Sequence, residues 1–480
     1  MCDCENRNFE WDKRKPPRFG SSAIRRLVLG ARRLLAARAT QVSICETLAG
    51  RCERGHSMRI FLLSLCAMAA LGGCALSQSA DMLENIAQSP CEVGIFGSEA
   101  SFVALTRSGD QFPYSFSDGR VGDVGDPIVR GCEPGSLALA NGTALARIPI
   151  KVQPTHFASN DAILAGQLIE PFDAGPHTPL VVHAHGSEES GWIEAARDPY
   201  QMVGRGISVF VYDKRGTGRS EGAYSQNFPQ LADDLVAASR EAKRLAGDRF
   251  GRFGLVGLSQ GGWIAPLAAN RADADFVAVG YGLVVDILEE DAAQVELELR
   301  RAGYGDDVLA KGRLVTGVTG LIAKSGYTEG LDELDALRER YRDEPWFQQI
   351  KGGFSGVILE MTTDELRDNG IPMFDRLNID WSLVPMEVMR SVAVPQLWVL
   401  AGEDREAPVA TTLARLKTLL AEGKSIAIYV FPDTDHGMWE FEDRPDGSRQ
   451  MLRITPGFYD LMADWAKGER EAVYGDSVQE

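Results

Sequence analysis

Short runs of apolar residues recur from about residue 148 onward, and longer amphipathic stretches separate them. Each run is only four to eight residues long and rich in Val, Leu, Ile and Phe, which is typical of buried strands. Residues 229–246 and 455–467 have the composition and spacing of helices. Buried strands that alternate with helices predict a largely parallel sheet covered by helices. The expected strands are residues 148–152, 162–169, 179–184, 207–212, 253–256, 276–280, 396–401 and 425–431.

The alternation stops between residues 283 and 390. This stretch is charged and helix-forming, with repeated apolar faces at residues 285–302 and 331–341. A segment of this length between two strands of one sheet is too long for a simple connection. We therefore expect a helical insertion that forms a lid on one large α/β domain spanning residues 151–480.

Residues 91–150 have a different pattern, rich in Gly, Ser and Asp. The run at 101–105 is of the strand type, and turn signals lie at 108–110 and 117–119. These features predict a small β-rich accessory segment. Residues 74–90 are small and polar, and we expect a tether there.

An apolar run without charges covers residues 60–70, directly after Met58 and Arg59. It is too short to span a bilayer, and its order of positive flank, apolar core and small residues is typical of a signal peptide. A buried core helix is the alternative. Leu71-Gly72-Gly73-Cys74 resembles the lipobox of bacterial lipoproteins. The resemblance implies a signal peptide at 58–73, a lipid anchor on Cys74 and a place on the periplasmic side of a bacterial cell envelope. Residues 1–57 would then be an artefactual or dispensable extension.

Composition changes once residues 1–73 are set aside. The full chain of 480 residues has eight cysteines and a net charge of −18, but the chain from Cys74 has 37 basic and 62 acidic residues, or −25. Such an acidic chain argues against nucleic acid as a partner. The cysteine spacing does not favour zinc. Cys91 and Cys132 could pair in an oxidising compartment or remain two free thiols.

The sequence Gly257-Leu258-Ser259-Gln260-Gly261 follows the expected strand 253–256 and precedes a helix. This is the G-x-S-x-G motif in the strand–turn–helix context where a serine becomes a nucleophile. Small neighbours are needed because the turn is tight and strained. A chance match in a chain with 50 glycines is the alternative.

A serine hydroxyl needs a base, and histidine is the side chain best suited to that role. His436 follows the last expected strand, in the chain order Ser, acid, His that this motif requires. Asp404, which follows the strand 396–401, is the expected acid that orients His436, with Glu403 and Glu406 as substitutes. The alternatives are a solvated surface histidine and an aspartate that only caps a helix.

Two backbone N–H groups should stabilise the oxyanion that forms during acyl transfer. We expect one from Gln260, which follows the nucleophile, and the second from Ser187, with Glu188 less favoured. His183 and His185 lie two residues apart on a strand without a clear third ligand, so we predict no metal site there. His185 is expected to shape its loop.

Together these residues resemble the α/β-hydrolase superfamily. The match includes His185-Gly186, the elbow at Ser259, Asp404, His436 and the run Tyr212-Asp213-Lys214-Arg215-Gly216-Thr217-Gly218-Arg219-Ser220. The resemblance implies an α/β fold with a mostly parallel eight-stranded sheet, a Ser–Asp–His triad and no cofactor. Within the superfamily, the His-Gly-Ser turn and the helical insertion look most like bacterial esterases of the serine aminopeptidase-like and dienelactone-hydrolase-like group.

The expected reaction is hydrolysis of a small carboxylic ester through an acyl-enzyme on Ser259. A thioesterase and an aminopeptidase-like serine peptidase are alternatives, because this fold serves many acyl-transfer reactions. A peptidase would need groups that bind a peptide terminus, for which Glu289, Glu290 and Asp291 of the insertion are candidates; otherwise they form a solvated helix face. An envelope lipoprotein that binds without catalysis is the non-enzymatic alternative. The oligomeric state is left open.

Overall fold

The computed structural model describes residues 91–370 and 372–480, so Cys74, the expected signal peptide at 58–73, the extension at 1–57 and the tether at 74–90 lie outside it. The centre of this described part is a nine-stranded sheet in the order β8-β9-β11-β10-β12-β13-β14-β15-β19. Strands β11, β10, β12, β13, β14 and β15 are parallel, whereas β8, β9 and β19 run antiparallel to their neighbours. The bounds are β8 (Ile150–Ser159), β9 (Ala162–Pro171), β10 (Leu180–Ala184), β11 (Ser208–Tyr212), β12 (Phe253–Leu258), β13 (Phe276–Gly280), β14 (Gln396–Ala401), β15 (Ile426–Phe431) and β19 (Val478–Gln479).

This arrangement is the α/β-hydrolase sheet that the sequence predicts, with one addition. The eight expected strands are β8 to β15, and the ninth is the two-residue β19, which pairs with Tyr429 and Val430 at the edge. Strand β8 continues to Ser159, beyond the expected end at 152, because it forms a long hairpin with β9. Its outward side chains are mostly exposed, so no apolar run marked that extension in the sequence.

Helices cover both faces of the sheet because successive strand residues point to opposite sides. Leu180 and Val182 pack in one apolar cluster with α4 (Phe228–Ala246), α5 (Gly261–Ala269) and α13 (Val409–Ala421). Val181 packs in the opposite cluster with α3 (Arg197–Val203) and α14 (Phe458–Lys467). The two clusters fix the sheet between two helical layers, and the strand ends carry the loops of the site.

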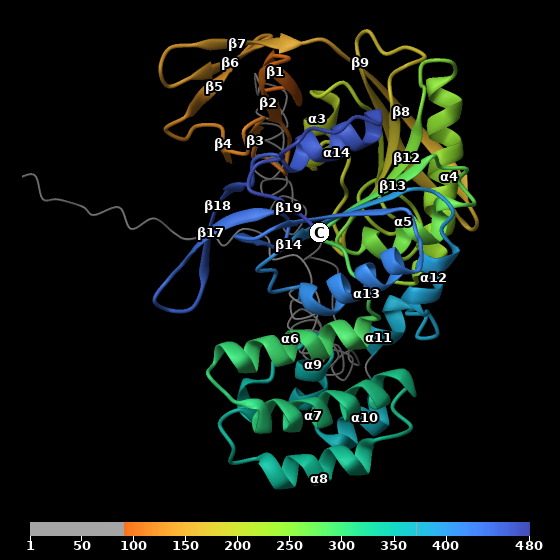
Figure 1. Cartoon of the computed structure of the whole chain (residues 1–480), viewed down its shortest axis with the longest axis vertical. Coiled ribbons are helices and arrows are strands. Elements are labelled where there is room, and N and C mark those ends of the chain that lie inside the picture. Colours follow the sequence, from red (N-terminus) through yellow and green to blue (C-terminus); the bar gives the residue numbers. More distant parts are fainter. Residues whose placement is uncertain (1–90, 371) are drawn as a thin grey trace, which may run out of the picture.

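A helical insertion follows β13 and ends before β14. Its elements are α6 (Ile287–Arg301), α7 (Asp306–Lys324), α8 (Leu331–Tyr341), η1 (Phe347–Gln349), α9 (Ser355–Glu360), α10 (Thr363–Asn369), α11 (Pro372–Leu377) and α12 (Pro385–Ser391). In Figure 1 helices α6 to α10 form a separate lobe at the lower end of the molecule. Two apolar clusters lie within this lobe, around Leu334 and around Trp346. Helix α12 instead contacts α5 and α13 through the core cluster, so we use the word lid for α6 to α11.

The segment before the central sheet is an antiparallel seven-stranded sheet in the order β4-β3-β2-β1-β7-β6-β5. Its strands are β1 (Gly94–Ser98), β2 (Ser101–Leu105), β3 (Pro113–Phe116), β4 (Val121–Asp123), β5 (Val129–Glu133), β6 (Ser136–Leu139) and β7 (Ala144–Ile148), and a disulfide joins Cys91 to Cys132. Ile95 and Phe102 pack into the cluster of α3 and α14, and buried Gln201 of α3 donates to the carbonyls of Ser115 and Phe116. The small sheet is therefore part of one packed body with the hydrolase core.

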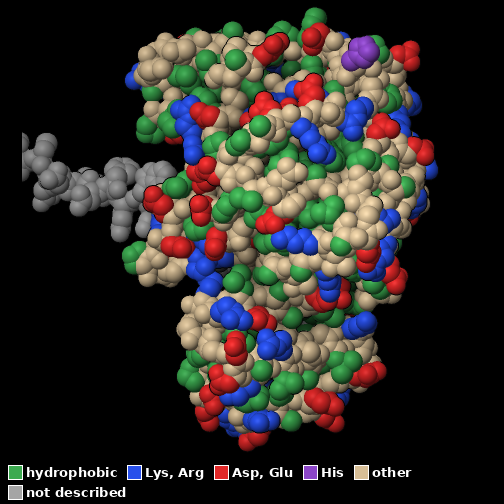
Figure 2. Space-filling model, viewed as in Figure 1, with side chains coloured by type: hydrophobic (Ala, Val, Ile, Leu, Met, Phe, Trp, Pro, Cys, Tyr) green, Lys and Arg blue, Asp and Glu red, His purple; other side chains and the backbone are tan. Residues whose placement is uncertain are grey.

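A three-stranded sheet of β16 (Thr434–Asp435), β17 (Trp439–Asp443) and β18 (Arg449–Ile454) follows β15. The sequence analysis did not predict this hairpin, whose strands are short and largely polar. No helix among the described residues is long and apolar enough to cross a bilayer. Figure 2 shows acidic and basic side chains interspersed over one face of the molecule.

Candidate active site

Ser259 lies in a tight turn between β12 and α5, with a φ of 52°. A positive φ is uncommon for a residue with a side chain and marks local strain. The flanking glycines are required by close contacts: a Cβ at Gly257 would lie 2.2 Å from the carbonyl oxygen of Gly261, and one at Gly261 would lie 2.1 Å from that of Ala184. The helix can approach the strands only without those side chains, and the turn then presents Ser259 at the ends of the parallel strands.

His436 directly follows the short strand β16 and Asp404 lies in the loop after β14, and both side chains reach Ser259 or its partner. The Nε2 atom of His436 is 2.9 Å from Oγ of Ser259, and its Nδ1 atom is 2.8 Å from Oδ2 of Asp404. The other oxygen of Asp404 accepts hydrogen bonds from the backbone N–H groups of Glu406 and Ala407. These bonds fix the buried carboxylate, and the structure thus brings together the serine, histidine and aspartate that the sequence analysis singled out.

The two substitute acids lie elsewhere. Glu403 is exposed and 3.4 Å from Arg449, whereas Glu406 places a carboxylate oxygen 3.8 Å from Nε2 of His436, the ring nitrogen that faces Ser259. Burial alone would lower the pKa of His436, but the charges of Asp404, Glu406 and Asp435 outweigh it and raise the pKa above its usual range. Asp404 is therefore the acid at Nδ1, and Glu406 is a second carboxylate that acts on the same ring.

The expected oxyanion donors lie beside Ser259. Ser187 and Gln260 both line the cleft, and a Cβ at Gly186 would be 3.5 Å from Cβ of Ser259. Within the described part of the chain, the N–H groups of Ser187 and Gln260 donate no hydrogen bond to a protein acceptor. Such unused donors next to a nucleophile suit a developing oxyanion. Glu188 instead turns its carboxylate toward the indole N–H of Trp192.

His183 and His185 are buried behind this loop. The ring of His185 stacks on Trp192 at a centroid distance of 4.6 Å, and its Nδ1 is 3.6 Å from Oε1 of Glu188. Burial lowers the pKa of both, to about 4 for His183, so the rings are neutral. In residues 91–370 and 372–480 no group of three or more His, Cys, Asp or Glu side chains is placed to hold a metal ion.

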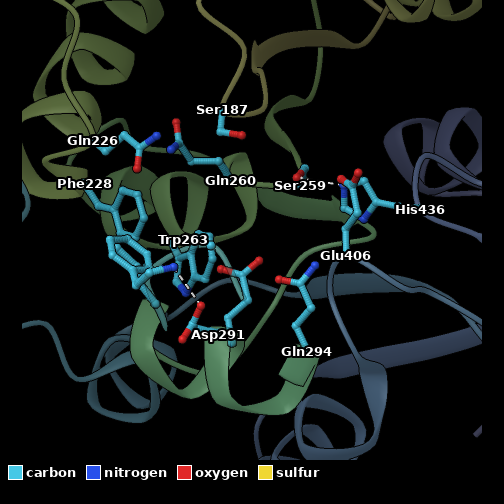
Figure 3. A pocket seen from close by; sticks show the side chains of 14 residues that line it. Ser187, Gln226, Phe228, Ser259, Gln260, Trp263, Asp291, Gln294, Glu406 and His436 are labelled. Carbon is cyan, nitrogen blue, oxygen red and sulfur yellow. Dashed lines mark hydrogen bonds and ion pairs between the residues drawn. The ribbon is translucent and has the colours of Figure 1, made fainter. Parts of the chain in front are cut away.

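A cleft lies between the core and the lid, with Ser259 at its base. Figure 3 shows side chains from the lid helix α6 and from the core pointing into the same space. The core contributes Ser187, Gln226, Phe228, Ser259, Gln260, Trp263, Glu406 and His436, and the lid side contributes Ile287, Glu290, Asp291, Gln294, Gly353 and Phe354. The cleft is therefore lined by polar and acidic side chains near Ser259 and by the aromatic side chains of Phe228 and Trp263.

The three acidic candidates of the insertion take three different places. Glu289 pairs with Arg415 of α13 at 2.6 Å, outside the cleft. Asp291 accepts from the N–H groups of Phe354 and Ser355 and from the Ser355 hydroxyl, which uses its carboxylate within the lid. Glu290 lines the cleft, and burial with nearby carboxylates raises its pKa to about 8. Only Glu290 of the three is available to a substrate.

Sequence reasoning missed one cation. Lys214 is buried, and its ammonium lies against Gly186 and Gln260, although it belongs to the run 212–220 already noted. Its neighbours in that run have structural partners: Arg215 pairs with buried Asp234, and Asp213 accepts backbone N–H groups from Trp192 and Ile193. The signal in the sequence was a lysine inside a run whose other charged residues, Asp213 and Arg215, were expected to be structural.

A family model described as the alpha/beta hydrolase family matches residues 180–448. No curated protein matches the chain. Similar solved structures include an esterase of Pyrococcus furiosus, with 13% identity over 60% of this chain and 84% of that one at a TM-score of 0.38. An acylaminoacyl peptidase of Pyrococcus horikoshii has 16% identity over 70% of this chain and 50% of its own, also at 0.38. A 2-hydroxy-6-oxo-6-phenylhexa-2,4-dienoate hydrolase of Rhodococcus has 16% identity over 60% and 92%, at 0.33.

Proposed function

The chain belongs to the alpha/beta hydrolase family, and we propose that it is a serine hydrolase that cleaves carboxylic esters through an acyl-enzyme on Ser259. The observation that carries the proposal is the continuous line of hydrogen bonds from Asp404 through His436 to Ser259, at 2.8 and 2.9 Å. This is the arrangement that turns a weak hydroxyl nucleophile into an effective one.

In this mechanism Oγ of Ser259 attacks the substrate carbonyl while Nε2 of His436 takes its proton. Asp404 holds the other ring nitrogen and stabilises the imidazolium that forms. The N–H groups of Gln260 and Ser187 receive the oxyanion, and His436 then protonates the leaving alcohol. A water molecule, deprotonated by the same histidine, releases the acid and restores the serine.

The direct test compares the wild-type chain with Ser259→Ala on a panel of p-nitrophenyl esters. We expect kcat to fall by about 10⁶-fold, since loss of a nucleophilic serine has that effect in other hydrolases. Ser239→Ala is the matched control, because its hydroxyl is buried in α4 and donates to the Leu235 carbonyl, away from the cleft. A fluorophosphonate probe should label wild type on Ser259. A folded wild-type protein that neither labels nor turns over would contradict the proposal and favour a non-catalytic binding role.

A second candidate is an aminopeptidase-like serine peptidase. The carboxylates of Glu290 and Glu406 both line the cleft near His436, and no Lys or Arg is among the residues that line it. A bound ammonium group would lower the pKa of Glu290 from about 8 and favour its charged form, so this cleft favours substrates with a free ammonium group. Aminoacyl-p-nitroanilides, run beside the esters, separate this candidate, and acyl thioesters in the same panel separate a thioesterase.

We also propose that the protein is held at the bacterial cell envelope, on the periplasmic side, by a lipid on Cys74, which lies outside the described residues. The Cys91–Cys132 disulfide supports an oxidising compartment. Mass spectrometry of the protein from its native membrane should find a mature chain that begins at Cys74 with the mass of a lipid on it. Peptides from residues 1–57, or an unmodified Cys74, would contradict this.

A further inference from the structure

Lys214 is a buried cation that the mechanism above does not use. It lies in the loop after β11 and is 2% exposed. Its Nζ donates to the carbonyl oxygen of Gly186 at 2.5 Å and lies 3.4 Å from Oε1 of Gln260 and 5.1 Å from the centre of the Tyr224 ring. Burying an ammonium group costs free energy unless it is well paired. The buried position of Lys214 therefore calls for a functional explanation.

One acceptor of Lys214 is the side chain of Gln260, and the other is the carbonyl of the peptide unit whose N–H belongs to Ser187. The carbonyl of Gly186 and the N–H of Ser187 are one peptide unit, and the described residues contain no cis peptide bond. In a trans peptide the carbonyl and the N–H point in opposite directions. An ammonium that holds the Gly186 oxygen therefore also sets the direction of the Ser187 N–H.

A second side chain holds the same loop from the next peptide unit. The hydroxyl of Tyr224 donates to the carbonyl oxygen of Ser187 at 2.6 Å. Ser187 thus has its two flanking carbonyls bound by side chains of one loop, residues 213–226, while its own N–H has no protein acceptor among the described residues. Two side-chain hydrogen bonds thus fix the loop after β10, and the N–H of Ser187 remains available for a substrate oxygen.

We propose that Lys214 is a positioning residue for the oxyanion hole: it orients and polarises the Gly186–Ser187 peptide so that the Ser187 N–H can stabilise the tetrahedral intermediate. This inference rests on the proposed serine hydrolase function. A cation bound to a carbonyl draws electron density from the peptide and makes its N–H a stronger donor, since hydrogen bonds in a chain polarise one another. The stronger hydrogen bond matters most when negative charge develops on the substrate oxygen in the transition state. The loss of Lys214 should therefore lower kcat more than it weakens substrate binding.

The surroundings of Lys214 make its charge sensitive to alkaline pH. Burial lowers its pKa to about 8, while Glu188 and Glu189 on the loop after β10 oppose that shift. His185 on the same loop and Tyr224 on its own loop are the other titratable groups that face it, and both are neutral near pH 7 because burial lowers the first pKa and raises the second. As pH rises through the Lys214 pKa the ammonium is lost, and activity should fall.

The test is Lys214→Met on the full chain, with kcat and KM measured for a p-nitrophenyl ester across pH. We expect kcat at neutral pH to fall by about 10- to 100-fold, less than the 10²–10³ of a lost direct donor, with KM within about twofold. The alkaline decline of wild type should disappear. Lys243→Met is the matched control, because Lys243 also donates to a carbonyl, that of Ala272, and lies over a ring, that of Phe253, away from the cleft.

Tyr224→Phe is the second variant, and it decides the matter if Lys214→Met does not fold. It removes the hydroxyl on the Ser187 carbonyl and should lower kcat several-fold without shifting the alkaline decline. A folded Lys214→Met enzyme with kcat within about twofold of wild type overturns the inference, as does an equal loss in Lys243→Met. If Lys214→Met is unfolded, unchanged kcat in Tyr224→Phe overturns it. Ser259→Ala is measured in parallel. If its turnover equals that of wild type, the proposed serine hydrolase function itself fails, and this outcome is distinct from a failure of the inference about Lys214.

Discussion

At the scale of single residues, the imidazole of His436 faces a carboxylate at each nitrogen. Asp404 accepts at Nδ1, where it orients the ring, and Glu406 lies 3.8 Å from Nε2, the nitrogen that must be unprotonated to act as base. Both charges favour the imidazolium, and together with Asp435 they raise the pKa of His436 against the effect of burial. The acid limb of the activity profile should therefore lie at a higher pH than it would if the base were a histidine with an unshifted pKa.

Glu406→Gln removes the charge at Nε2 and should lower the pKa of His436. Because the neutral ring is the active form, the acid limb of the kcat/KM profile should then move to lower pH, with activity at high pH little changed. The measurement is kcat/KM for a neutral ester from pH 6 to just above pH 10, a range that includes the raised His436 pKa of about 10. Glu403→Gln is the control, since Glu403 lies against Arg449 and should leave the limb in place. An acid limb unmoved in Glu406→Gln would exclude this coupling.

The sequence predicts those candidate site residues that belong to short local motifs. Ser259 was identifiable from its glycines, and His436 and Asp404 from their order after expected strands. Lys214 and the place of Glu406 were not, because each depends on two loops that are distant in sequence and meet only when β10, β11, β14 and β15 lie in one sheet. Charge on a loop residue does not reveal which neighbour it meets.

At the scale of elements, the lid helix α6 shows how one helix distributes a run of acids. Successive helical residues point about 100° apart. Glu289 therefore reaches Arg415 on the core, Glu290 faces the cleft, and Asp291 binds the lid backbone at Phe354 and Ser355. The three acids were expected either to form a solvated face or to bind a substrate. Of these, Glu290 alone is available in the cleft, because Asp291 is engaged by the lid backbone and Glu289 by α13.

Glu290→Gln tests whether this helix reads a cationic substrate. If the enzyme accepts aminoacyl-p-nitroanilides, their ammonium group should lower the Glu290 pKa from about 8 and make a charge-assisted contact with its carboxylate. The substitution should then lower kcat/KM for them by about tenfold or more, because such a contact is worth about 1.5–3 kcal/mol. Hydrolysis of neutral p-nitrophenyl esters should be nearly unchanged. Glu289→Gln serves as the control from outside the cleft. Equal effects on charged and neutral substrates would argue against a role in recognition.

The elements themselves were predictable where burial imposes a simple pattern. The strands β10 to β15 are largely apolar and buried at nearly every residue because both faces are covered. The hairpin β17–β18 and the far half of β8 lack that cover and carry polar, partly exposed residues, so no periodicity marked them. Helix α12 was assigned to the lid because chain position alone does not show that Met389 packs with α5.

At the scale of the whole molecule, the structure combines three parts around one sheet. The seven-stranded sheet shares an apolar cluster with α3 and α14, and the lid meets the core at the opposite end of the long axis (Figure 1). The cleft is built across the junction of lid and core, since Ser259 belongs to one and Glu290 to the other. In the proposed function the core therefore carries the reacting groups, and we expect the lid to influence which substrates reach them.

The position of the lid also bears on how the chain folds. Strands β13 and β14 are paired neighbours, yet residues 281–395 separate them. Closing a flexible loop of that length costs about 2 kcal/mol more than closing one of ten residues, by the logarithmic dependence of loop entropy on length. The lid has its own apolar clusters and a capping box at Asp286, so it can gain structure before its ends meet. We expect the lid to condense early and to bring β14 to the growing sheet, so that assembly of the nucleophile's partners is a late step of folding.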